Sequence, residues 1–451
     1  MGMNRSPVRP FQISRRDFLK RTATTAAGIG VPAWYLSQML DAAEPAPALS
    51  ANDKPGIALI GCGGQGRNDA KLATAFGNVV AVCDVDAKHA AEAAQQFGGA
   101  TIYSDFRKLL ARDDVHAVIN GTPDHWHTFI NLAAMKAGKD VYSEKPLTLT
   151  IDEGRRLVAA TRESKRVLQT GSQQRSDTRF RLACELVRNG RIGTLKHVQV
   201  VLPAGLHGGP FSTAPVPEGL DWNTWQGQVK EHDYVPQRCH LYFRYWLDYS
   251  GGTMTDWGAH HHDIALWGAD CERTGPVSIE GRALAQPIPQ GYDAPSEYEV
   301  HYEYANGVKQ TTISTLRNRF DGSIAPDQSK DLPEHGVKFE GSDGWIFVTR
   351  GKIEASRPEF LSEPLKDRKV ELYVSTNHMG NFFDCVRSRK APICDAEIGH
   401  RSVSVCHLGV LAIRLGRKLK WEPAKEQFEG DAEANQYVGR EQRKPFTYEM
   451  V

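Results

Sequence analysis

Short apolar segments alternate with helix-like segments between residues 57 and 170. Each apolar segment is nearly continuous and ends in glycine or a polar residue, a pattern typical of strands buried on both faces. The expected strands are 57–60, 79–83, 101–103, 115–119, 140–143 and 167–170, with helices at 87–97, 106–111 and 123–137 between them. Strand–helix alternation with short loops predicts an α/β fold with a doubly wound parallel sheet of the Rossmann type.

After residue 176 the pattern changes to longer segments in which apolar and polar residues alternate. This alternation predicts a second, α+β domain with a large, open, mostly antiparallel sheet. Its expected strands are 196–202, 277–284, 298–304, 309–316, 337–340 and 345–348. Helices at 377–386 and 401–415 are expected to pack back across both domains. One face of such a sheet is left for another subunit, so we expect a homo-oligomer, either a dimer or a tetramer.

The first fifty residues have the pattern of an export leader. Ser14-Arg15-Arg16-Asp17-Phe18-Leu19-Lys20 matches the twin-arginine signal, a weakly apolar stretch follows at 22–40, and Ala46-Pro47-Ala48 fits a cleavage site. Threonines, Pro32 and Gln38 make this stretch a poor membrane span. We therefore divide the chain into 1–50, 51–175 and 176–451. The protein is expected to be exported folded by the twin-arginine machinery to the periplasm or the extracellular space.

Composition excludes some partners. A formal net charge of +1 gives no electrostatic reason to expect nucleic acid or a membrane surface as a partner, and no later segment suggests a membrane span. The eight cysteines contain no C-x-x-C pair, so we expect free and mostly buried thiols.

The first candidate site is the glycine-rich turn after strand 57–60. Gly61 allows a tight turn, Gly63 allows close approach of a pyrophosphate, and Gly66 allows close helix–strand packing. Asp84 ends the next strand, where a carboxylate binds the ribose hydroxyls of NAD and repels the 2′-phosphate of NADP. The alternative is a plain tight turn with a solvated Asp84. We expect NAD, with NADP possible, bound by Gly61, Gly63, Gly64, Gln65, Gly66, Asp84, Asn120, Thr122, Pro123, His127, Glu144 and Lys145.

Two further segments carry candidate chemistry. Ser143-Glu144-Lys145-Pro146 places an acid and an amine at a strand end, where functional groups gather in such sheets. In the segment 251–263, Thr253 and Asp256 resemble a capping box, so a helix is expected to begin there. Asp256 and His260 would then share one face with Asp263. Similarly, Thr122 is expected to cap the helix that Pro123 begins.

With these motifs, the chain from Gly56 to its C-terminus resembles the glucose–fructose oxidoreductase, inositol dehydrogenase and rhizopine catabolism (Gfo/Idh/MocA) family. The resemblance implies that Lys145, Asp256 and His260 form the catalytic group beside the nicotinamide. The twin-arginine leader, the segment 122–127 and the run Trp257-Gly258-Ala259-His260-His261 resemble an exported subgroup.

The residue types suit oxidation of a secondary alcohol. His260 would accept the hydroxyl proton, Asp256 would fix its tautomer and favour its charged form, and Lys145 would stabilise the developing alkoxide. Judged by spacing alone, Asp256 and His260 are equally typical of a surface pair and Lys145 of a solvated lysine. The resemblance favours the catalytic interpretation.

Substrate contacts are expected from aromatic and charged side chains near the strand ends and in the second domain. The candidates are His125, Trp126, Gln173, Arg175, Arg244, Tyr245 and His378, together with Trp222 and Trp246. Each also has an ordinary interpretation as a core aromatic or a surface charge. The histidines 260–262 point about 100° apart on a helix and cannot all bind one ion, so we expect no metal.

The sequence therefore predicts an exported NAD(P)-dependent oxidoreductase that acts on a secondary hydroxyl of a sugar, polyol or glycoside. The cofactor should be tightly bound, because the cell envelope offers no free nicotinamide pool. One alternative is a redox-neutral enzyme that oxidises a glycoside transiently, then eliminates or epimerises and recycles the cofactor. Another is a non-catalytic sugar-binding relative.

Overall fold

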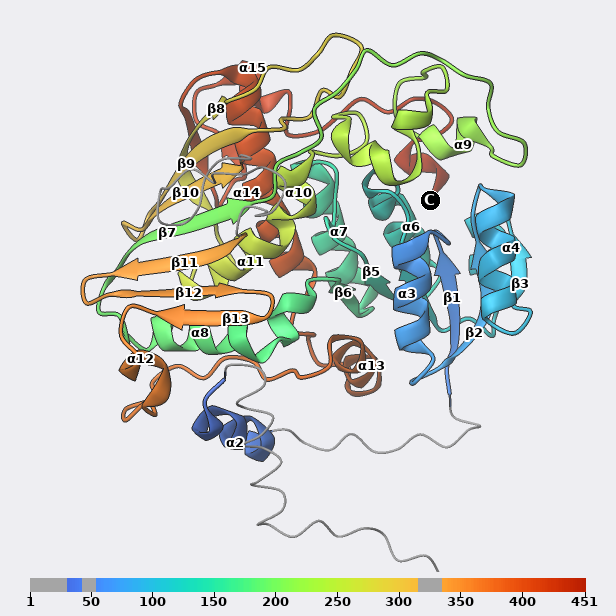
Figure 1. The fold of residues 1–451 in the computed structure, drawn as a ribbon. Coiled ribbons are helices and arrows are strands. Elements are labelled where there is room, and N and C mark those ends of the chain that lie inside the picture. The colour runs from blue at the N-terminus through green and yellow to red at the C-terminus, as the bar shows by residue number, and fades with distance from the viewer. Residues whose placement is uncertain (1–30, 43–53, 315–334) are drawn as a thin grey trace, which may run out of the picture.

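The computed structural model describes residues 31–42, 54–314 and 335–451 (Figure 1). Two β-sheets lie side by side, each covered by helices. Arg15, Arg16 and the proposed cleavage site at 46–48 lie outside the described residues, as do the last two residues of the strand expected at 309–316.

The first sheet has six strands in the order β3-β2-β1-β4-β5-β6, and every pairing is parallel. The strands are β1 Gly56–Ile60, β2 Asn78–Cys83, β3 Thr101–Tyr103, β4 Ala117–Asn120, β5 Asp140–Ser143 and β6 Leu168–Thr170. The connecting helices are α3 Gly64–Ala73, α4 Ala87–Gln96, α5 Phe106–Leu110, α6 Asp124–Lys136 and α7 Ile151–Ser164. The predicted doubly wound fold is confirmed.

Helix starts follow local hydrogen bonding. Thr150 and Glu153 form the predicted capping box of α7, and the Asp86 carboxylate caps α4. The predicted cap of α6 is wrong, because α6 begins at Asp124, one residue after Pro123. The Thr122 hydroxyl instead donates to Asn120 Oδ1 at 2.7 Å, so it stabilises the preceding turn.

The second sheet has nine strands in the order β13-β12-β11-β7-β10-β9-β8-β14-β15. They are β7 Leu195–Leu202, β8 Pro276–Ala283, β9 Tyr298–Tyr304, β10 Lys309–Ser314, β11 Gly336–Gly341, β12 Trp345–Thr349, β13 Lys352–Ala355, β14 Leu419–Glu422 and β15 Gln427–Phe428. Only β7 and β10 pair in parallel, so the predicted mostly antiparallel sheet is confirmed. The sequence analysis missed the short strands β13, β14 and β15.

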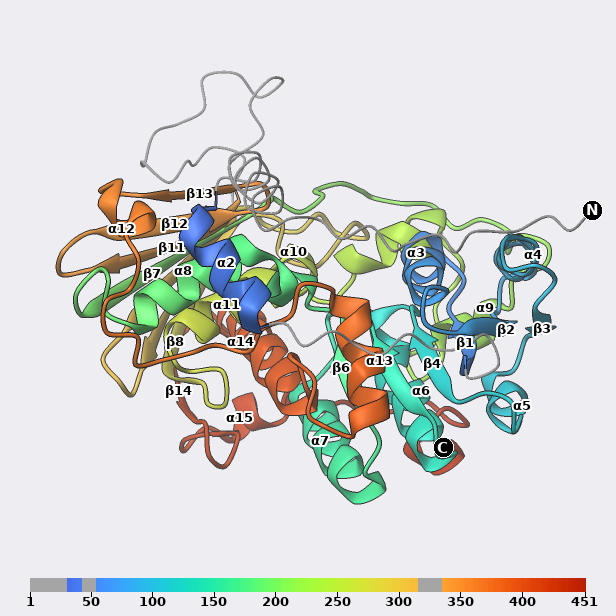
Figure 2. The same ribbon diagram turned by 90° about the horizontal axis from the view of Figure 1, so that it is seen from below.

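Helices cover one face of this sheet. They include α8 Thr178–Arg188, α11 Gly258–Gly268 and α14 Ala396–Leu415, with α12 Glu359–Ser362 and α15 Ala432–Asn435 at the periphery. Helix α14 contacts both α7 of the first domain and β8 of the second, and α13 His378–Ser388 contacts α3. Figure 2 shows α13 and α14 between the two sheets, where these C-terminal helices contact elements of both domains.

The segment 251–263 forms two helices where one was expected. Helix α10 Thr253–Asp256 follows Gly252 without a side-chain cap, and Trp257 separates it from α11. The predicted capping box is therefore wrong. The Thr253 hydroxyl instead contacts the Tyr298 hydroxyl on β9 at 3.1 Å.

Part of the segment assigned to the leader packs on the second domain. Helix α2 Ala33–Ala42 lies beside α8 and α12 (Figure 2). Arg181 Nη1 donates to the buried Tyr35 hydroxyl at 2.6 Å, and Trp34 Nε1 donates to Leu361 O at 3.1 Å.

Across the described residues, the helices are all too short or too polar to span a bilayer. All eight cysteines are buried and unpaired, as predicted.

Candidate active site and cofactor cavity

The turn between β1 and α3 is built for close approach of backbone segments. Gly61 has φ +86°, and a Cβ there would lie 2.4 Å from Thr122 N. A Cβ on Gly66 would lie 2.1 Å from Gly61 O, whereas one on Gly63 would meet no atom within 4 Å. The turn therefore excludes side chains on its inner side and leaves Gly63 open to a ligand, which fits a dinucleotide pyrophosphate.

Gly121 is a part of this cradle that the sequence analysis missed. A Cβ on Gly121 would lie 2.5 Å from Gly66 Cα, so the β1 and β4 turns touch through their glycines. The sequence could have indicated this role, because Gly121 directly follows strand β4 and ligands bind at strand ends in such sheets.

A cavity of about 760 Å³ opens over this turn. Of the expected cofactor contacts, it is lined by Gly61, Gly63, Gly64, Gln65, Asp84, Thr122 and Pro123. Asp84 Oδ2 accepts from Cys62 N at 2.7 Å and Oδ1 accepts from Asp86 N at 2.9 Å. Burial raises the pKa of Asp84, while these two backbone donors act to lower it. The carboxylate keeps lone pairs for ribose hydroxyls, so the residues present fit NAD.

Five expected cofactor residues do not line the cavity, namely Gly66, Asn120, His127, Glu144 and Lys145. Three of these have buried polar side chains that bond to neighbouring loops. Asn120 Nδ2 donates to Asn131 Oδ1 at 2.8 Å and to His127 O at 3.2 Å. The His127 ring lies between Pro146 O at 2.7 Å and Thr122 O at 2.8 Å, and burial lowers its pKa to about 4.

Glu144, the third, accepts from Gln173 Nε2 at 2.7 Å and from Lys145 N at 3.2 Å. All three side chains are buried. In this structure their side chains bond to neighbouring strand-end loops, and their contact with the cofactor stays a prediction.

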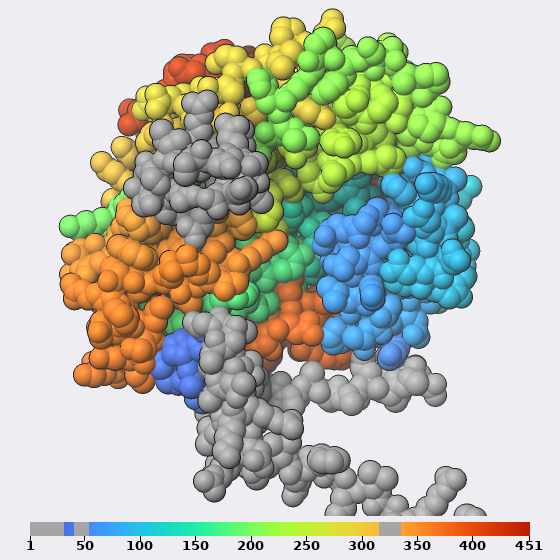
Figure 3. All heavy atoms as spheres, viewed as in Figure 1, coloured from blue at the N-terminus to red at the C-terminus, as the bar shows by residue number. Residues whose placement is uncertain are grey.

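A long insertion between β7 and α10, residues 203–252, closes one side of the cavity. Two backbone hydrogen bonds join it to the first domain, Ala87 N to Gly219 O at 2.9 Å and Asp221 N to Val85 O at 3.0 Å. The cavity wall contributed by this insertion consists of Asp221, Thr224, Trp225, His240, Leu241, Phe243 and Arg244, and the C-terminal tail adds Phe446 and Met450. In Figure 3 the insertion, in light green, sits against the end of the blue first domain. The sequence analysis missed this wall because the insertion has little periodic structure beyond the short helix α9 Trp222–Gln226.

Lys145 and Asp256 are in direct contact. Lys145 Nζ donates to Asp256 Oδ1 at 2.5 Å and to Asp256 O at 3.1 Å, and Arg244 Nε lies 3.4 Å from the same Oδ1. Burial alone would raise the pKa of Asp256, but Lys145 and Arg244 outweigh it and hold the pKa below its usual value. Because Arg244 also lines the cavity, the ion pair adjoins the cofactor space.

His260 lies on α11 and is buried, but its environment differs from the expected one. No hydrogen bond joins it to Asp256 in the described part of the chain, and its Nδ1 has no partner there. Burial first, and then Lys145 and Arg350, lower the pKa of His260 well below its usual value. The expectation that Asp256 fixes the His260 tautomer and favours its charged form is therefore wrong.

Arg350 was also missed by the sequence analysis. Arg350 lies in the turn between β12 and β13. Its guanidinium lies over the Trp257 ring, 4.8 Å from the ring centroid. Arginine in a strand–strand turn gave no sequence signal, and only the fold brings it near His260.

Arg175 is not a substrate residue. It is buried, with Nε 2.7 Å from Asp263 Oδ2 and Nη1 2.8 Å from Glu272 Oε2, and it stacks on Trp267. Ser402 Oγ donates to the other Asp263 oxygen at 2.7 Å. Asp263 is therefore part of a buried ion pair and does not share a polar face with Asp256.

The two other histidine candidates are also structural. His378 Nε2 lies 2.9 Å from Thr170 O and its Nδ1 lies 2.9 Å from Ser176 Oγ. His125 Nε2 lies 2.8 Å from Trp225 O, within an aromatic cluster.

Among the aromatic candidates, Trp222 and Trp246 are core residues. Their indole N–H groups donate to His232 O and Gln237 O. Trp126 lines the cavity as Arg244 does, whereas Tyr245 packs on Tyr292.

The parallel sheet, the glycine cradle and the strand-end lysine define a dinucleotide-dependent oxidoreductase. Residues 56–172 match the NAD-binding Rossmann fold of an oxidoreductase family, and residues 208–448 match the C-terminal alpha/beta domain of that family. The chain belongs to the Gfo/Idh/MocA oxidoreductase family.

Similar proteins include a glycosyl hydrolase family 109 protein of Saccharopolyspora erythraea, 33% identical over 46% of this chain and 48% of that one. Inositol 2-dehydrogenase of Burkholderia cenocepacia is 34% identical over 30% of this chain and 42% of that one. The chain thus spans about half or less of the length of these curated relatives. The WlbA dehydrogenase of Bordetella pertussis, solved with NADH and UDP-GlcNAcA, has a similar fold, with a TM-score of 0.61, 18% identity and coverage of 82% of this chain and 99% of that one.

Proposed function

We propose that the protein uses tightly bound NAD to oxidise a secondary hydroxyl of a sugar, polyol or glycoside, with Lys145, Asp256 and His260 as the catalytic group. The observation that carries this proposal is the Lys145–Asp256 ion pair at the end of β5, beside a cavity that fits a dinucleotide. Residues 51–175 would bind the cofactor, and residues 176–451 would bind the substrate and form the oligomer.

The ion pair with Asp256 fixes the position of the Lys145 ammonium group. A carboxylate and a carbonyl oxygen of the same residue hold its ammonium group, which would also donate to the substrate oxygen. Positive charge at this oxygen stabilises the alkoxide that develops as the C–H bond breaks. NAD, when bound, supplies the hydride acceptor.

His260 would accept the hydroxyl proton in this scheme. Its lowered pKa keeps the ring neutral near pH 7, so an unprotonated nitrogen is available. The hydride leaves carbon, the proton leaves oxygen to His260, and a ketone remains. Asp256 acts through Lys145 and not through His260.

A redox-neutral glycoside-modifying activity is the second candidate function. The similarity to a glycosyl hydrolase family 109 protein supports it, as does the enclosure of the cavity by the insertion and the C-terminal tail. Oxidation to a ketone would make the C–H on the neighbouring carbon acidic. Loss of that proton would allow epimerisation, or elimination of the aglycone followed by addition of water, after which the hydride returns to the carbonyl carbon. A non-catalytic sugar-binding role is disfavoured by the intact Gly61, Asp84, Lys145, Asp256 and His260.

One incubation separates these activities. Purified protein is mixed with a panel of sugars, polyols and glycosides, while the absorbance of reduced nicotinamide and the products are followed together. Net oxidation predicts stoichiometric ketone and lasting reduction of the cofactor. Redox-neutral chemistry predicts many turnovers with only transient reduction, and a binding protein predicts neither.

We also propose export by the twin-arginine pathway to the periplasm or beyond, on the basis of residues 14–20. Replacing both Arg15 and Arg16 with lysine should retain folded, cofactor-loaded protein in the cytosol, because the export machinery recognises this pair. Normal export of that variant would contradict the proposal.

A further inference from the structure

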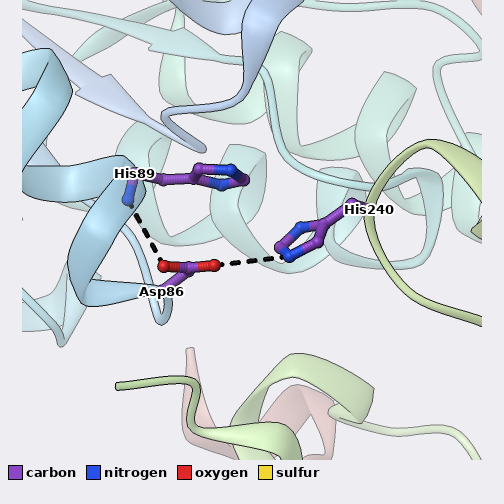
Figure 4. A group of neighbouring side chains, drawn as sticks. All are labelled: Asp86, His89 and His240. Atoms are coloured by element: carbon purple, nitrogen blue, oxygen red, sulfur yellow. Dashed lines mark hydrogen bonds and ion pairs between the residues drawn. The ribbon is translucent and has the colours of Figure 1, made fainter. Parts of the chain in front are cut away.

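Three potential metal ligands meet at the rim of the cofactor cavity (Figure 4). Asp86 caps α4, His89 lies in the first turn of that helix, and His240 belongs to the insertion 203–252. One ligand atom from each residue lies within 4.8 Å of the other two. His89 and His240 also line the cavity, which the Lys145–Asp256 ion pair adjoins through Arg244.

The two Asp86 oxygens have different partners. Oδ1 accepts from Lys88 N at 2.9 Å and from His89 N at 3.3 Å, which caps the helix. Oδ2 faces His240 Nε2 at 3.3 Å. One carboxylate oxygen is thus fixed by the backbone, and the other is directed at an imidazole nitrogen.

The spacing suits a tetrahedral ion. Zinc bonds of about 2.0–2.1 Å place neighbouring tetrahedral ligands roughly 3.3 Å apart, which is the Asp86–His240 separation already present. The His89 and His240 rings lie 4.6 Å apart between centroids with an interplanar angle of 56°. The third ligand atom, from His89, lies within 4.8 Å of the other two, so the His89 side chain would have to shift to complete the site.

His240 has φ +50°, a conformation that non-glycine residues rarely adopt and that often occurs at functional sites.

We propose that Asp86, His89 and His240 bind one divalent transition-metal ion, with Zn²⁺ as the best-matched ion, and that water completes its coordination. Two imidazoles and one carboxylate are ligands that zinc accepts. Because His240 comes from the insertion and the other two ligands from the first domain, the ion joins these parts at the cavity rim. The site is separate from the catalytic group and does not depend on the proposed reaction.

The test uses the full, untagged protein after chelator treatment, titrated with Zn²⁺ alone by calorimetry and analysed for metal after gel filtration. We expect one equivalent in the wild type. His240→Ala and His89→Ala should each weaken binding by at least about tenfold, because one of three protein ligands is lost. His207→Ala is the matched control, since His207 is an exposed histidine of the same insertion that contacts Gln286 O.

Further measurements exclude a trivial loss of structure. Circular dichroism should be unchanged in the variants, and Co²⁺ should give a tetrahedral absorption band only with the wild type and the control. Zn²⁺ should raise the Tm of the wild type more than that of the His240 variant. Absence of stoichiometric binding in the wild type, or equal affinity in His240→Ala, would overturn the proposal and leave a simple carboxylate–imidazole pair.

Discussion

Single contacts decide what each candidate residue can do. Lys145 and Arg350 both lower the pKa of His260. The Asp256 carboxylate forms ion pairs with Lys145 and Arg244 and makes no hydrogen bond with His260 in the described residues. The proposed catalytic group is therefore an ion pair beside a neutral histidine, and not an aspartate–histidine pair beside a lysine. This arrangement defines how each variant should behave.

Asp84 should control cofactor choice. Asp84→Ser removes a carboxylate that would face the 2′-phosphate of NADP, so NAD binding should weaken and discrimination against NADP should fall. Affinities for both cofactors, measured by fluorescence titration of stripped protein, check this. An unchanged ratio of the two affinities would mean that the adenosine ribose is recognised elsewhere.

His260 should set the acidic side of the pH–rate profile. Its pKa lies below the usual value of about 6.5, so the rate of the wild type should fall only at pH values well below that. His260→Ala should be slower by about 10²-fold or more and should lose this acidic limb. A profile with the same acidic limb in the variant would assign the proton transfer to another group.

At the residue scale, the roles that could be predicted from the sequence are those that depend on the conformation of the neighbouring backbone. Gly61, Gly63 and Gly66 act through turn geometry, which their own spacing reveals. Arg175 and His378 could not be placed, because their roles depend on partners far along the chain. Arg175 pairs with Asp263, 88 residues away, and His378 contacts Thr170, 208 residues away.

At the scale of elements, periodic segments were predictable and irregular ones were not. Strand β9 was predicted with its observed bounds, because apolar and polar residues alternate throughout Tyr298–Tyr304. Strands β13, β14 and β15 are short, with β13 and β15 at the two edges of the sheet and β14 next to β15, and their alternation is too brief to recognise. The insertion 203–252 is held by two backbone hydrogen bonds to the first domain and by side-chain contacts such as those of Arg443, and neither leaves a periodic signal in the sequence.

Arg443 should act as a clamp on this insertion. Its guanidinium donates to Val229 O at 2.9 Å, Asn223 Oδ1 at 2.8 Å and Gly227 O at 2.8 Å. Arg443→Ala should therefore loosen the cavity wall and speed cofactor release by several-fold to about tenfold, since partly exposed hydrogen bonds make a net contribution of only roughly 0.5–1.5 kcal/mol. The NAD dissociation rate measures this.

Arg282→Ala is the matched control, because its exposed ion pair with Glu299 lies on the second sheet. Equal dissociation rates in the wild type and both variants would show that the insertion does not retain the cofactor.

At the scale of the whole molecule, α2 joins the N-terminal segment to the second domain. The apolar core of the second domain includes Val31, Tyr35 and Met39. Arg181 and Glu185 lie against Tyr35. Cleavage after Ala48 would remove this helix and uncover the buried Arg181–Glu185 ion pair.

Truncation should reveal how much α2 contributes. A chain that begins at residue 49 should have a lower Tm than one that begins at residue 31. Burial of its apolar side chains, less the entropy of ordering, is expected to stabilise the fold by about 2 kcal/mol or more. Thermal unfolding of the two chains, with mass analysis of the exported protein, checks this. Equal Tm values would mean that α2 adds no stability.

The most direct test of the account is the turnover of Lys145→Met. Methionine keeps the length and apolar stem of lysine while removing the charge, so folding and NAD loading should persist. The lost interaction forms mainly as negative charge builds on the substrate oxygen, so kcat should fall by roughly 10²–10³-fold while KM changes little. Turnover near the wild-type rate with saturating substrate would contradict the catalytic assignment.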